Sequence, residues 1–220
     1  MIATKYSMHT RSKTTRWLTL GAVIGPILFT LAWIILGFIS PGYPLWDLWI
    51  APYSAISQPI SGLGLGITAP YMNAAFILTG ILTIAGAVGI YRNISEEGAT
   101  KRWRYLLLLT LPGLGTIMDG VFNLESMMLH NLGFLLVLSV IVSFPIIGSQ
   151  LRNIPGWQQF GRWLILGGPL TLILAVLYFA TFNPEASGAG IGIGGLTQRL
   201  LIVQIHVWYV VLGWKTFHMA

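Results

Sequence analysis

Long apolar runs alternate with short polar segments along the chain. Six of these runs are about 20 residues long, which is roughly the length that a helix needs to cross a hydrocarbon core of about 30 Å. No stretch between them is long enough for a soluble domain. We therefore predict a single all-α domain over residues 1–220, a polytopic bundle of six transmembrane helices. The approximate spans are 18–40, 70–91, 105–122, 129–151, 164–182 and 198–217.

Composition narrows the class of protein. Of the 220 residues, 55% are hydrophobic and 8% are charged, whereas about 25% are charged in an average soluble domain. This excludes a soluble globular protein, and the high apolar content excludes a disordered chain. The chain has no Cys, so disulfides, thiolate metal sites, Cys nucleophiles and lipidation through Cys are excluded as well.

The basic residues lie almost entirely on one side of the predicted bundle. Eleven of the twelve Lys and Arg fall in the N-terminal tail, in the loops at 92–104 and 152–162, or at Lys215. Because cytoplasmic loops are enriched in basic residues, this distribution predicts that both termini are cytoplasmic. On the other side Arg199 is the only basic residue. The net charge of +6 is therefore a topology signal, and we expect membrane lipids as partners and no nucleic acid.

The inner ends of the first, third and fifth predicted helices resemble one another. Each has an Arg-Trp pair followed by a Pro: Arg16-Trp17 with Pro26, Arg102-Trp103 with Pro112, and Arg162-Trp163 with Pro169. All three helices run outward, so the likeness indicates three parallel helical hairpins. The alternative is that the Arg-Trp pairs are ordinary interface anchors and that the prolines are merely tolerated, as they are in many membrane helices.

The outer loop at 41–69 is the one long connection, too apolar for a free loop and too broken for a span. Its aromatic and hydroxyl residues of interest are Tyr43, Trp46, Trp49, Tyr53 and Ser61. This composition is typical of a re-entrant or interfacial lid over the outer mouth of the bundle. A passive belt of aromatic residues at the lipid headgroups would have the same composition.

Five polar residues near the outer ends of the helices are candidates for a site. Asp119 is the only acid within a predicted span, and an ionisable group at that depth normally faces the bundle interior, a cavity or a partner. Arg199 and His206 are seven residues apart and share a helical face, with His206 at the predicted depth of Asp119. Glu125 and His130 are expected at the level of Arg199.

These depths lead to two expected pairs. Asp119 and His206 would face each other on the floor of an aromatic-lined cavity, and Arg199 would form an ion pair with Glu125. The alternative is that Asp119 makes a buried hydrogen bond or ion pair with a purely structural role.

No metal or haem site is predicted. The candidate ligands are divided between two depths without an H-E-x-x-H pattern, and His130 and His206 differ in depth by roughly a turn and a half, too much for bis-histidine haem ligation. A hydrolase triad with Ser61 lacks the G-x-S-x-G elbow. The sequence leaves the cofactor unknown.

Several short motifs occur in a recognisable order. They are Pro41-Gly42-Tyr43, Ile60-Ser61-x-Leu63, Gly120-Val121-Phe122 with Glu125 and His130, and Gly195-Leu196-Thr197-Gln198-Arg199. In this pattern the chain resembles the six-helix membrane family called domain of unknown function 998. The resemblance implies a prokaryotic plasma-membrane protein without an established reaction. It also selects Glu125, His130, Gln198 and Arg199 as family positions. The chain departs from the family pattern in two ways. Asp119 stands where the family would lead one to expect an uncharged residue, and the third turn is very short.

Three functional hypotheses follow. The first is a non-catalytic membrane protein, either an accessory subunit of a membrane complex or a binder of a lipid-like ligand at the outer polar cluster. The second is a membrane-embedded enzyme acting on a lipid or isoprenoid substrate, with Asp119 as general acid and His206 as its partner. The third is a small transporter.

Overall fold

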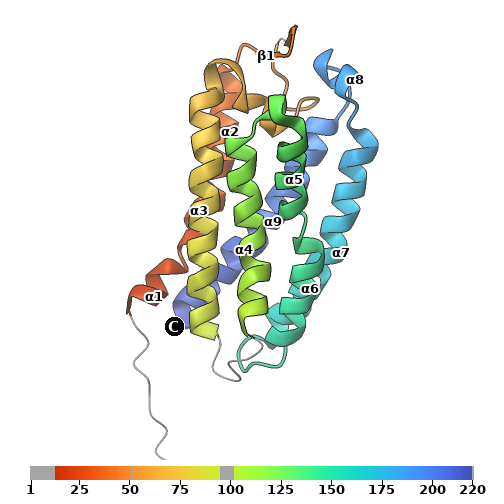
Figure 1. Ribbon diagram of the computed structural model, residues 1–220. Coiled ribbons are helices and arrows are strands. Elements are labelled where there is room, and N and C mark those ends of the chain that lie inside the picture. Colours follow the sequence, from red (N-terminus) through yellow and green to blue (C-terminus); the bar gives the residue numbers. More distant parts are fainter. Residues whose placement is uncertain (1–12, 51, 95–101, 220) are drawn as a thin grey trace, which may run out of the picture.

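The computed structural model describes residues 13–50, 52–94 and 102–219. Of the basic residues that support the predicted orientation, Lys5, Arg11 and Lys101 lie outside this part of the chain. The described chain folds into an elongated all-α bundle (Figure 1). Its helices are α1 (Lys13–Leu18), α2 (Gly21–Ile39), α3 (Ala69–Ile94), α4 (Arg102–Val121), α5 (Met127–Val137), α6 (Val140–Leu151), α7 (Gln158–Thr181), α8 (Pro184–Gly188) and α9 (Gly194–Met219).

Five helical stretches of the described chain are long and apolar enough to cross a membrane. They are 15–39, 66–94, 124–151, 158–181 and 194–219. The chain is therefore a multi-pass membrane protein. The sixth expected span corresponds to α4, which has 20 residues and contacts both α3 and α5. Arg102, Arg104 and Asp119 fall within α4, whereas none of the other five stretches has more than two charged residues.

The expected helix at 129–151 is two helices. At Leu138 and Ser139 the backbone changes to tighter i to i+3 hydrogen bonds, such as Ile141 N–H to Leu138 O at 3.0 Å. This break separates α5 from α6, and the two helices have different neighbours: α5 packs against α4, whereas α6 packs against α7. The break therefore lets α5 and α7 diverge toward one end of the bundle.

Glycines bring the helix backbones close together along these contacts. Gly115 on α4 lies against the Gly133 carbonyl on α5, and Gly148 on α6 lies against Gly161 on α7. Side chains at these positions would collide with backbone atoms of the facing helix. The backbones can approach closely at these positions because no side chain intervenes.

One end of the bundle, here called the hairpin end, is covered by the segment expected to form a lid. Strands β1 (Tyr43–Leu45) and β2 (Leu48–Ile50) form an antiparallel hairpin, in which Trp46 has a positive φ of 51°. Two 3₁₀ helices follow, η1 (Ile60–Gly64) and η2 (Gly66–Thr68). The hairpin and α8 lie at the same end, whereas α1 and the end of α9 lie at the opposite end (Figure 1).

The expected helical hairpins are not separate packing units. The most extensive helix contacts join α3 to α4 and α6 to α7, which belong to different hairpins in the predicted arrangement. The three-hairpin repeat stays a prediction.

Candidate functional site

A cavity of about 350 Å³ lies at the hairpin end of the bundle. Its inner wall consists of buried aromatic residues from three helices: Phe29 on α2, Phe76 on α3 and Tyr178 on α7. The hairpin contributes Tyr43, and η1 contributes Ser61. The segment predicted to be a lid therefore forms part of the wall of a cavity.

The mouth of the cavity lies between the outer parts of α5 and α7, where these helices diverge. Exposed residues from both helices line it, Met127 and Asn131 on α5 and Phe179 on α7, together with exposed Trp46 of the hairpin. Further along the two helices the ring of Phe134 meets that of Tyr178, with ring centres 5.7 Å apart. The exposed part of the cavity lining thus includes residues of both helices on the side where they separate.

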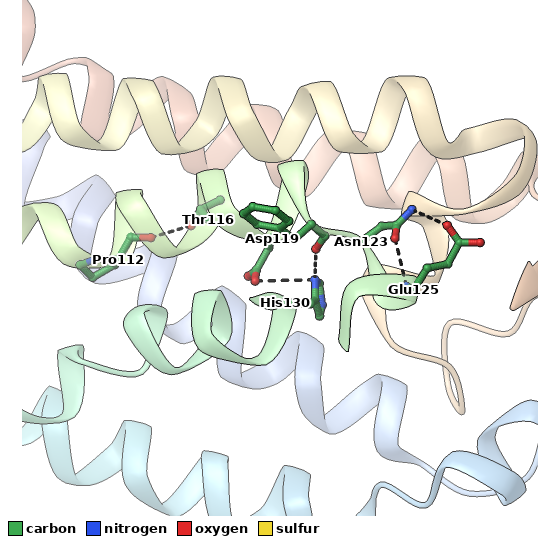
Figure 2. Close-up of polar contacts among 7 residues, drawn as sticks. Pro112, Thr116, Asp119, Asn123, Glu125 and His130 are labelled. Atoms are coloured by element: carbon green, nitrogen blue, oxygen red, sulfur yellow. Dashed lines mark hydrogen bonds and ion pairs between the residues drawn. The ribbon is translucent and has the colours of Figure 1, made fainter. Parts of the chain in front are cut away.

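Asp119 and His130 line this cavity together. Figure 2 shows their side chains pointing toward each other from α4 and α5, with Asp119 Oδ1 3.7 Å from His130 Nδ1. Both residues are buried. They meet because Asp119 lies two residues before the end of α4 and His130 three residues after the start of α5, so the antiparallel helices place them at the same level.

The hydrogen-bond pattern indicates which ring nitrogen of His130 carries a proton. Its Nδ1 lies 2.8 Å from the backbone oxygen of Phe122, and because a carbonyl only accepts, Nδ1 carries the proton and donates it. Asp119 Oδ1 is 3.7 Å from this Nδ1, which is too far for a hydrogen bond. It is a fully buried oxygen without a hydrogen-bond partner in the described chain. Nε2 of His130 makes no hydrogen bond within the described residues.

The space for the Asp119 carboxyl group comes from Gly133, one helical turn after His130. A Cβ atom at Gly133 would overlap Asp119 Oδ1 and would also contact the Gly115 carbonyl. Asp119, His130 and Gly133 thus form one structural unit across the contact between α4 and α5. Sequence reasoning missed Gly133, although its i+3 spacing from a candidate His was a signal for it.

The expected pairing of Asp119 with His206 is wrong. His206 lies at a separate shallow groove between α2 and α9, with Thr30 and Val207, and its ring packs edge-on against Phe29 with ring centres 5.5 Å apart. Its Nδ1 is buried and has no partner within the described residues. Similar depth alone does not determine a pair, because the rotation of α9 directs His206 into this other groove.

The expected ion pair between Arg199 and Glu125 is also wrong. Arg199 is buried, and its Nη1 donates to the backbone oxygens of Gln58 at 3.0 Å and Gly195 at 2.8 Å. Its Nη2 donates to the Tyr53 hydroxyl. Glu125 is exposed and accepts instead from Asn123 Nδ2 at 3.3 Å (Figure 2). The guanidinium satisfies the Gln58 carbonyl, which the irregular 52–60 segment leaves without a backbone partner, and also bonds the Gly195 carbonyl in the first turn of α9.

Aromatic rings complete the surroundings of Arg199. Its guanidinium carbon lies 5.1 Å from the centre of the Trp33 ring and 6.0 Å from that of Tyr53. Burial raises the pKa of Tyr53 and Arg199 opposes this rise, so the phenol stays neutral and its hydroxyl donates to Pro59 O at 3.3 Å. Charge compensation for Arg199 thus comes from carbonyl dipoles and ring faces.

The start of α9 anchors the segment that covers the cavity. Gln198 Oε1 accepts a hydrogen bond from Ile60 N–H at 2.7 Å, and Gly195 N–H donates to Ser57 O at 3.2 Å. Gly195 is required there, since a Cβ atom would overlap the Gln58 carbonyl. The Gln-Arg sequence selected by the family resemblance therefore joins α9 to the wall of the cavity.

Several polar groups on the cavity wall have no partner in the described part of the chain. The Tyr43 and Tyr178 hydroxyls, Ser61 Oγ and Gln198 Nε2 make no hydrogen bond within the described residues, although all four residues are buried and line the cavity. Burial raises the pKa of Tyr43 above its ordinary value, so this phenol is neutral. Of the expected lid residues, Trp49 is exposed and does not line the cavity.

Metal-ligating side chains do not gather at this site. Within the described chain no group of three or more His, Cys, Asp and Glu residues is close enough to hold a metal ion.

The chain matches the sequence profile of a family described as "Protein of unknown function (DUF998)" over residues 23–215, and it belongs to this family. No curated protein and no solved structure matches the chain.

Proposed function

We propose that this DUF998 family member binds an amphipathic, lipid-like ligand in the cavity at the hairpin end. The observation that carries the proposal is the cavity itself. It has an apolar, aromatic inner wall, a mouth between α5 and α7, and three polar atoms without a partner among the described residues: Asp119 Oδ1, His130 Nε2 and the Tyr178 hydroxyl. Ligand pockets typically combine such an apolar lining with a few convergent polar groups.

In this proposal the hairpin end faces the outer side of a prokaryotic plasma membrane, and α4 is the sixth span. The basic residues Arg92, Arg152 and Arg162 lie at the ends of α3, α6 and α7, and the enrichment of basic residues in cytoplasmic loops would place these ends inside. A lipid of the outer leaflet would then reach the cavity laterally, since the exposed mouth residues Met127 and Phe179 lie on the bundle surface.

The test uses two tryptophan variants on neighbouring positions of α5. Asn131 is exposed and lines the mouth of the cavity, whereas Leu132 is exposed and does not line it. After purification in a mild detergent, native mass spectrometry should detect a bound lipid-like molecule on the unmodified protein and on Leu132→Trp. The bulky ring of Asn131→Trp should reduce its occupancy severalfold.

Equal occupancy in both variants, or no bound molecule in any sample, would contradict the proposal. A stoichiometric protein that co-purifies without any lipid would instead favour an accessory subunit.

A second candidate, an enzyme acting on a lipid or isoprenoid, is favoured by one observation. A buried carboxyl group and an imidazole face the same cavity, which is an arrangement suited to proton transfer. Asp119 would be the general acid, and His130 takes the place of His206 as its partner. Conversion of the bound molecule during incubation, absent in Asp119→Asn, would support the enzyme, whereas recovery of the unchanged molecule supports binding alone.

A further inference from the structure

The charge of the cavity wall restricts the ligand's polar head. Among the described residues lining it, Asp119 is the one acid, and no Lys or Arg is present. Arg199 is adjacent in sequence to the lining residue Gln198, but its guanidinium is engaged by Gln58, Gly195 and Tyr53. A phosphate or carboxylate head would therefore meet a carboxyl group, and the basic ring on the wall, His130, already donates its Nδ1–H to the Phe122 carbonyl.

The carboxyl group of Asp119 lacks a hydrogen-bond donor. Oδ1 is fully buried and unpartnered, and Oδ2 accepts no hydrogen bond from the described chain either. The neighbouring His130 Nδ1–H is directed to the Phe122 carbonyl at 2.8 Å. Buried charges and polar groups are normally paired, so a group that donates hydrogen bonds is missing from this position.

The rings that line the cavity together with Asp119 suit a positively charged donor. Phe29 and Phe76 lie edge to face with ring centres 4.7 Å apart, and both line the cavity together with Tyr178 and Tyr43. Aromatic faces attract a cation, and ammonium groups are commonly recognised by several rings together with a carboxylate. A neutral alcohol would gain the hydrogen bond to Asp119 but would gain little from the ring faces.

We propose that the ligand is a lipophilic organic cation, with a protonated amine head at Asp119 among these rings and an apolar tail directed to the mouth between α5 and α7. This inference rests on the proposed function and specifies the chemical class of its ligand.

Three probes with the same twelve-carbon tail test the head group: dodecylamine, which is protonated at neutral pH, 1-dodecanol and dodecyl phosphate. Binding of each to the full-length protein in a maltoside detergent is measured by competition with the co-purified molecule or by calorimetry. The unmodified protein should bind the amine at least tenfold more tightly than the alcohol and should bind the phosphate most weakly.

Two acid-to-amide variants identify the responsible group. Asp119→Asn should remove most of the preference for the amine and leave the affinity for the alcohol within a factor of about three. Glu125→Gln is the matched control, because Glu125 is an exposed acid that does not line the cavity, and it should keep the full preference. If Asp119→Asn does not fold, Phe76→Leu serves instead, and it should weaken the amine more than the alcohol.

The outcomes separate the two proposals. Three results would overturn the proposal of a cationic head group: equal binding of amine and alcohol, tighter binding of the phosphate, or a preference for the amine that persists in Asp119→Asn. None of these results would contradict the proposal that the ligand is lipid-like. Binding of none of the three probes, together with the absence of a co-purified molecule, would overturn both.

Discussion

Oδ1 of Asp119 occupies the space in which a side chain at Gly133 would begin. The carboxyl group on α4 and the missing side chain on α5 are thus complementary parts of one helix contact. This relationship explains how an acid fits into a closely packed region of the bundle, and it connects the structure of α5 directly to the candidate site.

Gly133→Ala should destabilise the protein and displace Asp119. Its Cβ atom would overlap the carboxyl group and contact the Gly115 carbonyl, and such overpacking typically costs about 1–3 kcal/mol. Thermal unfolding in detergent measures the loss. The same substitution in an Asp119→Ala background should cost less, because the overlap with the carboxyl group is gone. Equal costs in both backgrounds would argue against the coupling.

Arg199→Met should loosen the 52–60 segment over the cavity. The substitution leaves Gln58 O, Gly195 O and the Tyr53 hydroxyl without their donor, and the loss of charged hydrogen bonds should lower stability by roughly 3 kcal/mol. Hydrogen exchange should increase in residues 52–60 first.

Glu125→Gln provides the control for this prediction. Glu125 is exposed and is bonded locally to Asn123, so stability should change by less than about 0.5 kcal/mol. A loss of stability comparable to that of Arg199→Met would contradict the structure and support the originally expected ion pair between Glu125 and Arg199.

His206→Leu should leave ligand binding unchanged. His206 lies at the groove between α2 and α9, and replacing a buried unpartnered polar atom by an apolar group should change stability by no more than about 1 kcal/mol, with stabilisation expected. Loss of the bound molecule in this variant would show that the site extends beyond the cavity at the hairpin end.

Single cysteines can determine the orientation, because the chain has none of its own. Asp47 at the hairpin turn and Asn153 between α6 and α7 are both exposed and lie at opposite ends of the bundle. In intact cells an impermeant maleimide should label Asp47→Cys, and it should label Asn153→Cys only after permeabilisation. The reverse pattern would invert the proposed topology.

The sequence by itself determined the fold class, the family and most helix positions. Apolar runs of about 20 residues can satisfy their backbone groups in a membrane only as helices or closed barrels, and the runs here are helix-length, so the spans near 70–91 and 164–182 agree with α3 and α7. Length and composition support five of the six expected spans. The composition of residues 41–69 predicted either a lid or a passive aromatic belt, and the hydrogen bonds of residues 57–60 to the start of α9 favour the lid.

Only the tertiary structure decided which polar residues meet. The sequence singled out Asp119, His130, Arg199 and His206, but depth along a helix does not specify the direction of a side chain around the helix axis. That direction depends on how each helix is rotated and packed. The close contact between Gly115 and Gly133 brings Asp119 of α4 to His130 of α5. The Gln58 carbonyl and the Tyr53 hydroxyl bind Arg199 to the 52–60 segment. Arg199 meets Gln58 across 141 residues of sequence, and even the contact between Asp119 and His130 joins two helices across a turn, so helical periodicity gives no information about either.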